Sequence, residues 1–312
     1  MRAFLKLVEI QTKIASVVPF IWSIVYTGYR FRSLQPLLLI YFFISMLAFD
    51  MFTTALNNYQ DWKRARKRHG YNYEKHNAIV RYGMSEKTVI LIIAVLFAIA
   101  VVFGILVFLH ADYMVLLLGM ACFLVGILYS AGPLPISRTP LGEIFSGFFM
   151  GYVLPFIVIY LSLFTGRPIR LVLENEHISI ILNWQVLLPV TVALIPPMLL
   201  IAGIMLANNI CDVEDDIENK RYTLPICMGK EKALILFYLL YVLCYLDILV
   251  GIVLGYLPVL SLITLLPAFR VVRNLQAFSR LQTKKDTFRY AVDNLILVMA
   301  PLILSTLLAW LV

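Results

Sequence analysis

Long apolar runs separated by short polar segments constrain this fold more than any other feature of the sequence. The hydrocarbon layer of a membrane is about 30 Å thick, and a helix of roughly 20 apolar residues crosses it. With 62% hydrophobic and 14% charged residues, the chain is too apolar for a soluble domain of its length. We therefore predict an all-α, integral membrane bundle of nine transmembrane helices that forms a single domain over residues 1–312. The runs lie near residues 14–30, 34–56, 88–109, 112–131, 141–163, 183–207, 233–254, 257–272 and 290–311.

Two segments of the chain are not assigned by the length of an apolar run alone. The apolar stretch from 233 to 268 is too long for one helix, and Gly255-Tyr256-Leu257-Pro258 supplies a turn that divides it in two. Residues 1–13 carry Arg2 and Lys6 and run into the first apolar stretch without a small-residue cleavage site. We expect this start to be a retained segment at the membrane interface.

The distribution of basic residues predicts the orientation in the membrane. Cytoplasmic loops collect Lys and Arg. With the N-terminus inside, only four of the 26 basic residues fall on the outer side: Arg30, Arg32, Arg167 and Arg170. We predict a multi-pass protein of the cell membrane with a cytoplasmic N-terminus and an external C-terminus. The net charge of +8 then reflects topology and contact with membrane lipid, and no soluble basic domain exists to bind nucleic acid.

Cysteine, histidine and glycine patterns exclude several kinds of site. The four histidines form no HxxxH or HExxH pattern, so neither zinc nor haem ligation is indicated. The sequence has no Walker loop, GxGxxG or GxSxG motif. Nothing indicates an obligate protein partner. Four cysteines show neither the pairing of a secreted framework nor paired CxxC spacing: Cys122, Cys211, Cys227 and Cys244.

An acidic motif follows directly on the sixth apolar run. Asn208, Asp212 and Asp216 recur at every fourth position, so on one helix their oxygens line a single face. Carboxylates stacked in this way repel one another unless a cation lies between them, and oxygen ligands suit Mg²⁺, which usually shares them with a phosphate substrate. Ionisable groups at the end of a membrane span are costly and tend to be functional. We predict that these three residues bind Mg²⁺, with a solvated acidic helix end as the alternative.

A shorter motif of the same kind ends the second run. Asn57 and Asp61 are again four residues apart, and both motifs emerge on the cytoplasmic side in the predicted topology. We therefore predict that Asn57 and Asp61 also bind Mg²⁺ across one shared pocket. Asp50 lies deeper on a similar face, where it either lines that pocket or is hydrogen-bonded within the bundle. Asp247, inside a later run, is either part of a proton path or a contact to a neighbouring helix.

A diphosphate also needs cations around its outer oxygens. The cytoplasmic side offers Lys13, Arg138, Lys220 and Arg221, and the alternative for each is the ordinary excess of positive charge on that side. We predict that all four contact the diphosphate.

Further stretches accompany the two acidic motifs: Gln11-Thr12-Lys13-Ile14-Ala15-Ser16 with Pro19, Tyr129-Ser130-Ala131-Gly132-Pro133-Leu134-Pro135 with Leu141-Gly142-Glu143, and Arg221-Tyr222-Thr223-Leu224 before Gly229. With these stretches and motifs, the chain resembles the UbiA superfamily of intramembrane prenyltransferases, in particular the branch acting on 1,4-dihydroxy-2-naphthoate in menaquinone biosynthesis. The resemblance covers essentially the whole chain. One departure is Ala65, where the family's first motif commonly has a further Asp.

The resemblance implies a bundle around a central cavity and a Mg²⁺-dependent transfer of a polyprenyl group from its diphosphate to an aromatic acceptor. It implies that Asp61, Asp212 and Asp216 act in catalysis, and that Lys13 and Arg221 are the favoured diphosphate contacts. Tyr129 would act in catalysis and Ser130 in substrate binding, both beside the reacting carbon. Asn57 and Asn208 would complete the ligands of the metal and the substrate.

Two alternatives stay open. The first is a transferase of the same superfamily with another acceptor, such as 4-hydroxybenzoate, homogentisate or haem, because motifs that bind a shared diphosphate do not distinguish acceptors. The second is a cation-coupled membrane transporter. Transporters place polar groups near the middle of the bilayer, whereas the acidic motifs here lie at the ends of apolar runs, which favours the enzyme.

Overall fold

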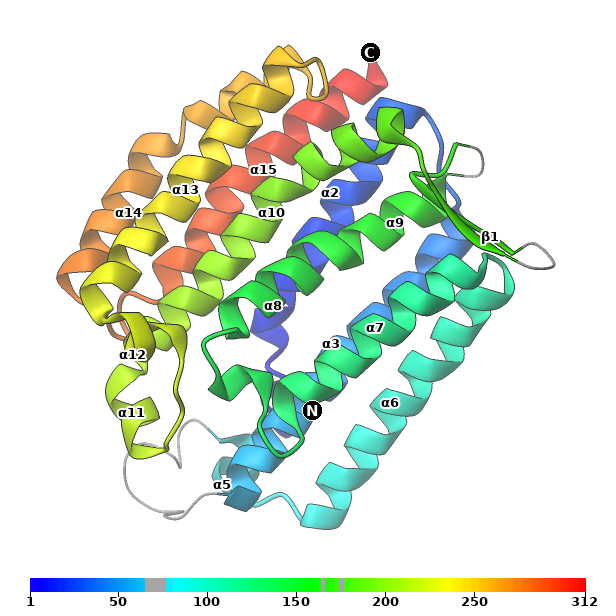
Figure 1. Ribbon diagram of the computed structural model, residues 1–312. Helices are drawn as coiled ribbons and strands as arrows, with labels where there is room; N and C mark the ends of the chain where they lie inside the picture. The colour runs from blue at the N-terminus through cyan, green and yellow to red at the C-terminus, as the bar shows by residue number, and fades with distance from the viewer. Residues whose placement is uncertain (65–76, 164–165, 174–176) are drawn as a thin grey trace. The chain divides into compact units, whose positions relative to one another are not determined.

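The computed structural model of the chain describes residues 1–64, 77–163, 166–173 and 177–312. The described residues form two compact units. Unit 1 comprises Met1–Val17 and Leu37–Pro135, and unit 2 comprises Val18–Pro36 and Ile136–Val312. Helices dominate both units (Figure 1).

Unit 1 is built on three long helices with well-defined starts. Ser85 accepts a hydrogen bond from the Thr88 amide at the start of α6, and Asp112 accepts bonds from Met114 and Val115 at the start of α7. The elements of unit 1 are α1 (Arg2–Leu7), η1 (Ile10–Lys13), the first turn of α2 (Ile14–Phe31), α3 (Pro36–Arg64), α5 (Ala78–Tyr82), α6 (Glu86–Leu109) and α7 (Tyr113–Ser130).

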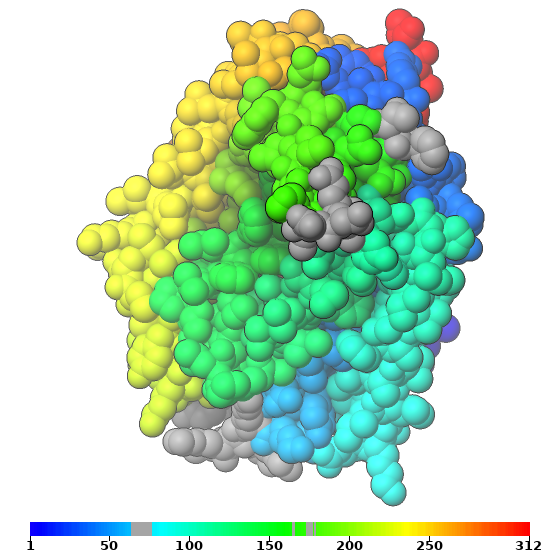
Figure 2. All heavy atoms as spheres, turned by 45° about the vertical axis from the view of Figure 1, so that its right-hand side comes forward, coloured from blue at the N-terminus to red at the C-terminus, as the bar shows by residue number. Residues whose placement is uncertain are grey.

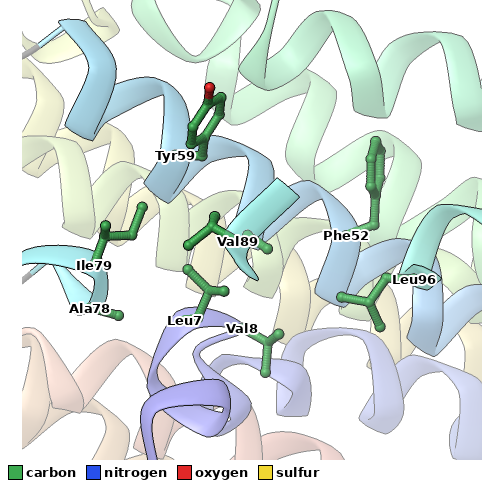
Figure 3. Close-up of a cluster of buried hydrophobic side chains, with 9 residues drawn as sticks. Leu7, Val8, Phe52, Tyr59, Ala78, Ile79, Val89 and Leu96 are labelled. Atoms are coloured by element: carbon green, nitrogen blue, oxygen red, sulfur yellow. The ribbon is translucent and has the colours of Figure 1, made fainter. Parts of the chain in front are cut away.

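A buried apolar cluster fixes the end of α3 that carries the first acidic motif (Figure 3). Phe52 and Tyr59 of α3 pack with Leu7 of α1 and with Val89 and Leu96 of α6 in this cluster. Between helices in lipid, such side chains associate through close van der Waals packing rather than through removal from water. The cluster therefore holds the last turns of α3 against α1 and α6.

The outer side of α6 has the character of a lipid-facing surface. This helix runs along the surface of the molecule (cyan in Figure 2), and its Leu91 and Leu109 side chains are 63% and 66% exposed. A contiguous apolar surface of this kind is rare in soluble proteins but is expected where a helix faces hydrocarbon.

Unit 2 is organised around α10 (Trp184–Cys211), which packs against α8 (Gly142–Phe148), η3 (Phe149–Val153), α13 (Lys230–Val253) and α15 (Arg289–Leu311) (Figure 1). Because Pro197 has no backbone N–H, the carbonyl of Ala193 has no helical partner, and the Trp22 indole donates to it over 2.8 Å. The other elements of unit 2 are the rest of α2, η2 (Ile136–Arg138), α9 (Leu154–Ser162), β1 (Ile169–Leu173), β2 (Ile178–Leu182), α11 (Val213–Glu218), α12 (Leu224–Met228), η4 (Val259–Leu265) and α14 (Ala268–Arg280).

Two glycines let α8 and η3 approach α10 closely. A Cβ added at Gly151 would lie 2.4 Å from the Cα of Met198, and one at Gly147 would lie 2.8 Å from the Met198 carbonyl oxygen. Only glycine allows backbones to come this close. The contact places the start of α8 beside the C-terminal half of α10.

Eight helices within the described residues are long and apolar enough to span a membrane. The first predicted run, residues 14–30, forms α2, which is helical over Ile14–Phe31 but is not among the eight; Ser16, Ser23, Thr27 and Arg30 lower its hydropathy. The predicted turn at Gly255 is confirmed, and this glycine has a left-handed φ of 68°. The eight are Pro36–Lys63, Glu86–Leu109, Tyr113–Ser130, Gly142–Ser162, Trp184–Cys211, Lys230–Val253, Val259–Arg280 and Arg289–Leu311.

One element departs from the all-α prediction. β1 and β2 form an antiparallel hairpin in which Leu171 pairs with Ile180, and it lies between α9 and α10. Its strands are five residues each, too short to stand out in a chain where apolar residues are common everywhere.

Candidate active site

The second acidic motif lies where α10 ends. The predicted single helix is interrupted at Asp212, which has φ −100° and ψ 6° and separates α10 from α11. The amide of Asp216 still donates to the carbonyl of Asp212 over 2.7 Å. Asp212 and Asp216 are therefore still linked by a helical i to i+4 hydrogen bond, but they do not lie on one continuous helix with Asn208 as predicted.

Burial separates the acids of this motif into two groups. Asp212 and Asp216 are buried, with 9% and 3% of their surfaces exposed, whereas Glu214 and Asp215 are exposed. The two carboxylates predicted to bind metal are thus the two that the fold removes from solvent, although a solvated acidic helix end would leave all of them exposed.

Each buried carboxylate has a cationic partner. Lys284, in the loop before α15, lies 2.5 Å from Asp212 through Nζ and Oδ2, and Arg221 lies 3.2 Å from Asp216 through Nε and Oδ1. Thr223 donates its hydroxyl hydrogen to the second oxygen of Asp216 over 3.2 Å. Burial raises the pKa of Asp216 to about 6, a shift that Arg221 opposes and Asp212 reinforces.

The segment after α11 connects this site to η2. Arg221 donates from Nη2 to the carbonyl of Ser137 over 3.2 Å, and the amide of Tyr222 donates to the carbonyl of Arg138 over 3.0 Å. Arg138 and Arg221, both predicted to contact diphosphate, therefore belong to one corner of unit 2. Lys220 is exposed and has a left-handed φ of 53°.

In unit 1, Lys13 and Asp50 form a buried ion pair. Nζ of Lys13 lies 2.6 Å from Oδ1 of Asp50, and also donates to the Asp50 carbonyl and to the Thr54 hydroxyl. Ser16 donates to the other Asp50 oxygen over 2.6 Å. The structure therefore agrees with the interpretation in which Asp50 is hydrogen-bonded within the bundle. All three hydrogens of the Lys13 ammonium are donated to protein groups.

The other predicted residues of unit 1 lie at the ends of two helices. Asn57 and Asp61 are partly buried in the last turns of α3. Tyr129 and Ser130 end α7, where Ser130 donates to the carbonyl of Thr53 over 3.5 Å. Position 65, where the first motif departs from the family pattern, lies outside the described residues. The joint pocket of the two motifs stays a prediction, since the motifs belong to different units.

Two residues that belong to the site around the second acidic motif were not predicted from the sequence. Lys284 lies in the polar segment between the last two helices, where no spacing links it to Asp212. Glu143 accepts a hydrogen bond from the Asn209 side chain over 2.8 Å, and both residues are buried. Glu143 stands in the Leu141-Gly142-Glu143 stretch of the family resemblance, which was the one available signal.

The residues around Asp212 and Asp216 fit a hard divalent cation. Their ligand atoms, with the side-chain oxygen of Asn208, are oxygens of the type that Mg²⁺ prefers. Burial raises the pKa of Asp216, and the charge of Asp212 adds to that shift, so a bound cation would favour the ionised form of this carboxylate. No group of three or more His, Cys, Asp or Glu side chains placed to hold a metal occurs within the described ranges, so substrate oxygens and water would have to complete the shell.

The chain belongs to the UbiA prenyltransferase family, which it matches over residues 16–310. It is 32% identical over 226 residues to 1,4-dihydroxy-2-naphthoate octaprenyltransferase of Bacillus subtilis (strain 168), a match that covers 72% of this chain and 66% of that protein, just under two thirds of its length.

Solved structures agree with this fold. A UbiA homologue from Aeropyrum pernix K1 has a TM-score of 0.67 at 18% identity, covering 94% of this chain and 98% of that one. A UbiA homologue from Archaeoglobus fulgidus bound to GPP and Mg²⁺ has a TM-score of 0.66 at 14% identity, covering 99% and 100%. At these identities the likeness concerns the fold.

Proposed function

We propose that this protein transfers a polyprenyl group from its diphosphate to an aromatic acceptor, with 1,4-dihydroxy-2-naphthoate as the favoured acceptor and demethylmenaquinone as the product. One observation carries the proposal: Asp212 and Asp216 are buried together at the end of α10, each with a cationic partner. The acceptor rests on the relative named 1,4-dihydroxy-2-naphthoate octaprenyltransferase, and the donor and metal rest on the homologue bound to GPP and Mg²⁺.

Asp212 and Asp216, with Asn208, are the residues of unit 2 that would hold Mg²⁺. The bound cation would neutralise the charge that develops on the departing diphosphate. Lys284 and Arg221, which pair with these two carboxylates, would be the cations nearest to the outer oxygens of a diphosphate held there, and Arg138 and Lys220 lie in the adjoining segments. Stabilising that leaving group allows the allylic carbon to react with an electron-rich aromatic ring.

We include the first acidic motif, Asn57 and Asp61, in the proposed site because of its chemistry and because of the family resemblance. Asn57 and Asp61 carry the same oxygen ligands at the same spacing as the second motif, and Tyr129 and Ser130 belong to the most distinctive of the shared stretches. Lys13 would reach a diphosphate only by exchanging its contacts with Asp50 and Thr54, so we propose it as a ligand that substrate would have to recruit.

The membrane setting follows from the donor. A polyprenyl tail costs roughly 0.8 kcal/mol per methylene-sized group to keep in water, so an apolar bundle open to lipid holds it at low cost. We propose that α2 is the ninth span, that the N-terminus and both acidic motifs are cytoplasmic, and that the C-terminus is external.

A transfer assay tests the reaction and its acceptor together. Purified protein in lipid receives a radiolabelled polyprenyl diphosphate and, separately, 1,4-dihydroxy-2-naphthoate, 4-hydroxybenzoate, homogentisate or haem. We expect a labelled product with the first acceptor, loss of product with EDTA and recovery with Mg²⁺. A product with another acceptor alone would assign that acceptor instead, and no product with any of them would refute the proposal.

A further inference from the structure

Glu143 is a buried acid to which the proposed reaction assigns no role. Only 4% of its surface is exposed, and Oε1 accepts the hydrogen bond from Asn209. Oε2 is fully buried and has no hydrogen-bond partner among the described residues. A buried carboxylate oxygen without a partner is destabilising, so this atom is expected to serve a partner that is bound during function.

The position of Glu143 is set by a close contact of α8 and η3 with α10. Glu143, Gly147 and Gly151 follow one another at four-residue spacing, and the two glycines bring the chain against Met198 and its neighbours on α10. Glu143 continues the same contact toward Asn209, which directly follows Asn208 of the acidic motif. The free oxygen is therefore held by rigid helices rather than by a loop.

The charges nearby decide which partner fits. Asp216 acts on Glu143 as a like charge, and a diphosphate oxygen placed directly against Oε2 would add a further like charge. What Oε2 lacks is a hydrogen-bond donor. Of the two substrates of the proposed reaction, the diphosphate offers only acceptor oxygens, whereas the aromatic acceptor carries hydroxyl groups that donate.

We propose that Glu143 binds the aromatic acceptor by accepting a hydrogen bond from one of its ring hydroxyls at Oε2, while Asn209 holds the carboxylate in place through Oε1. The inference rests on the proposed function and deepens it by naming a contact for the second substrate. A hydroxyl held there fixes which ring carbon meets the prenyl group, because the ring is then oriented by a rigid part of the fold.

The experiment compares a free acceptor with its methylated forms in three proteins. The acceptors are 1,4-dihydroxy-2-naphthoate and its methyl ether, in which one hydroxyl no longer donates; each hydroxyl is methylated in turn. The ratio of kcat/KM for the two acceptors is measured for the wild type, Glu143→Gln and the exposed control Glu214→Gln. This ratio does not depend on the fraction of folded enzyme, so partial unfolding of a variant leaves it interpretable.

We expect the wild type and Glu214→Gln to prefer the free hydroxyl at one ring position by about ten-fold or more, as for a hydrogen bond to a charged group, and Glu143→Gln to lose most of that preference. An unchanged ratio in Glu143→Gln, at both positions, would overturn the inference. A raised Mg²⁺ requirement with an unchanged ratio would also overturn it and assign Glu143 to the metal. If Glu143→Gln does not turn over, equilibrium binding of the two acceptors supplies the same ratio. A wild type that transfers nothing would instead refute the proposed function.

Discussion

Neighbouring acids of the second motif differ in burial, and this difference gives a matched pair of variants. Asp216→Asn removes a buried charge that we assign to metal binding, whereas Asp215→Asn changes an exposed acid one residue away. We expect turnover to fall by about a hundred-fold or more in Asp216→Asn, the scale of other lost electrostatic contacts in active sites, and to stay near wild type in Asp215→Asn. Equal activity of the two variants in a prenyl transfer assay would remove Asp216 from the site.

The ion pair of Lys13 and Asp50 yields a second prediction at this scale. In Asp50→Ala the Lys13 ammonium stays buried without its main partner, which costs about 3–5 kcal/mol for a buried pair. We expect a clearly lower melting temperature in detergent and partial recovery in the double variant Lys13→Met with Asp50→Ala. A single variant that melts like the wild type would show that the pair contributes little to the fold.

Among elements, the contact of η3 with α10 is the most sensitive to added volume. A Cβ at Gly151 would meet backbone atoms of Met198, which cannot move aside as a side chain can. We expect Gly151→Ala to lower stability by about 1–3 kcal/mol, as overpacking does. Gly119→Ala on α7 is the control, because a Cβ there has nothing within 4 Å. Thermal melts in which both variants match the wild type would contradict the close packing.

The elements also show how far sequence reasoning reaches. Runs of apolar residues predicted each long helix, since a span must satisfy its own backbone, and Gly255 predicted the turn after α13. The interruption at Asp212, the π-helical η3 and the hairpin depend on contacts made in three dimensions, which hydropathy does not record. Asp212 and Asp216 could be predicted as candidate site residues from their spacing. Lys284 could not, because it reaches Asp212 only through the fold.

For the whole molecule, the positive charges make a prediction about topology. A tag at the N-terminus should be protected in intact cells and a tag at the C-terminus accessible from outside, because basic residues are retained on the cytoplasmic side. The measurement is the cleavage of each tag by a membrane-impermeant protease. Termini on the same side would require an even number of spans and would exclude α2, or another helix, as a span.

The most direct test of the account is the binding of a non-reactive prenyl thiodiphosphate, measured by calorimetry at increasing Mg²⁺. The account predicts that binding by the wild type requires Mg²⁺, is lost with EDTA and is lost in Asp212→Asn, while Asp215→Asn binds as the wild type does. Binding that is equally tight without divalent cation, or unaffected in Asp212→Asn, would contradict it.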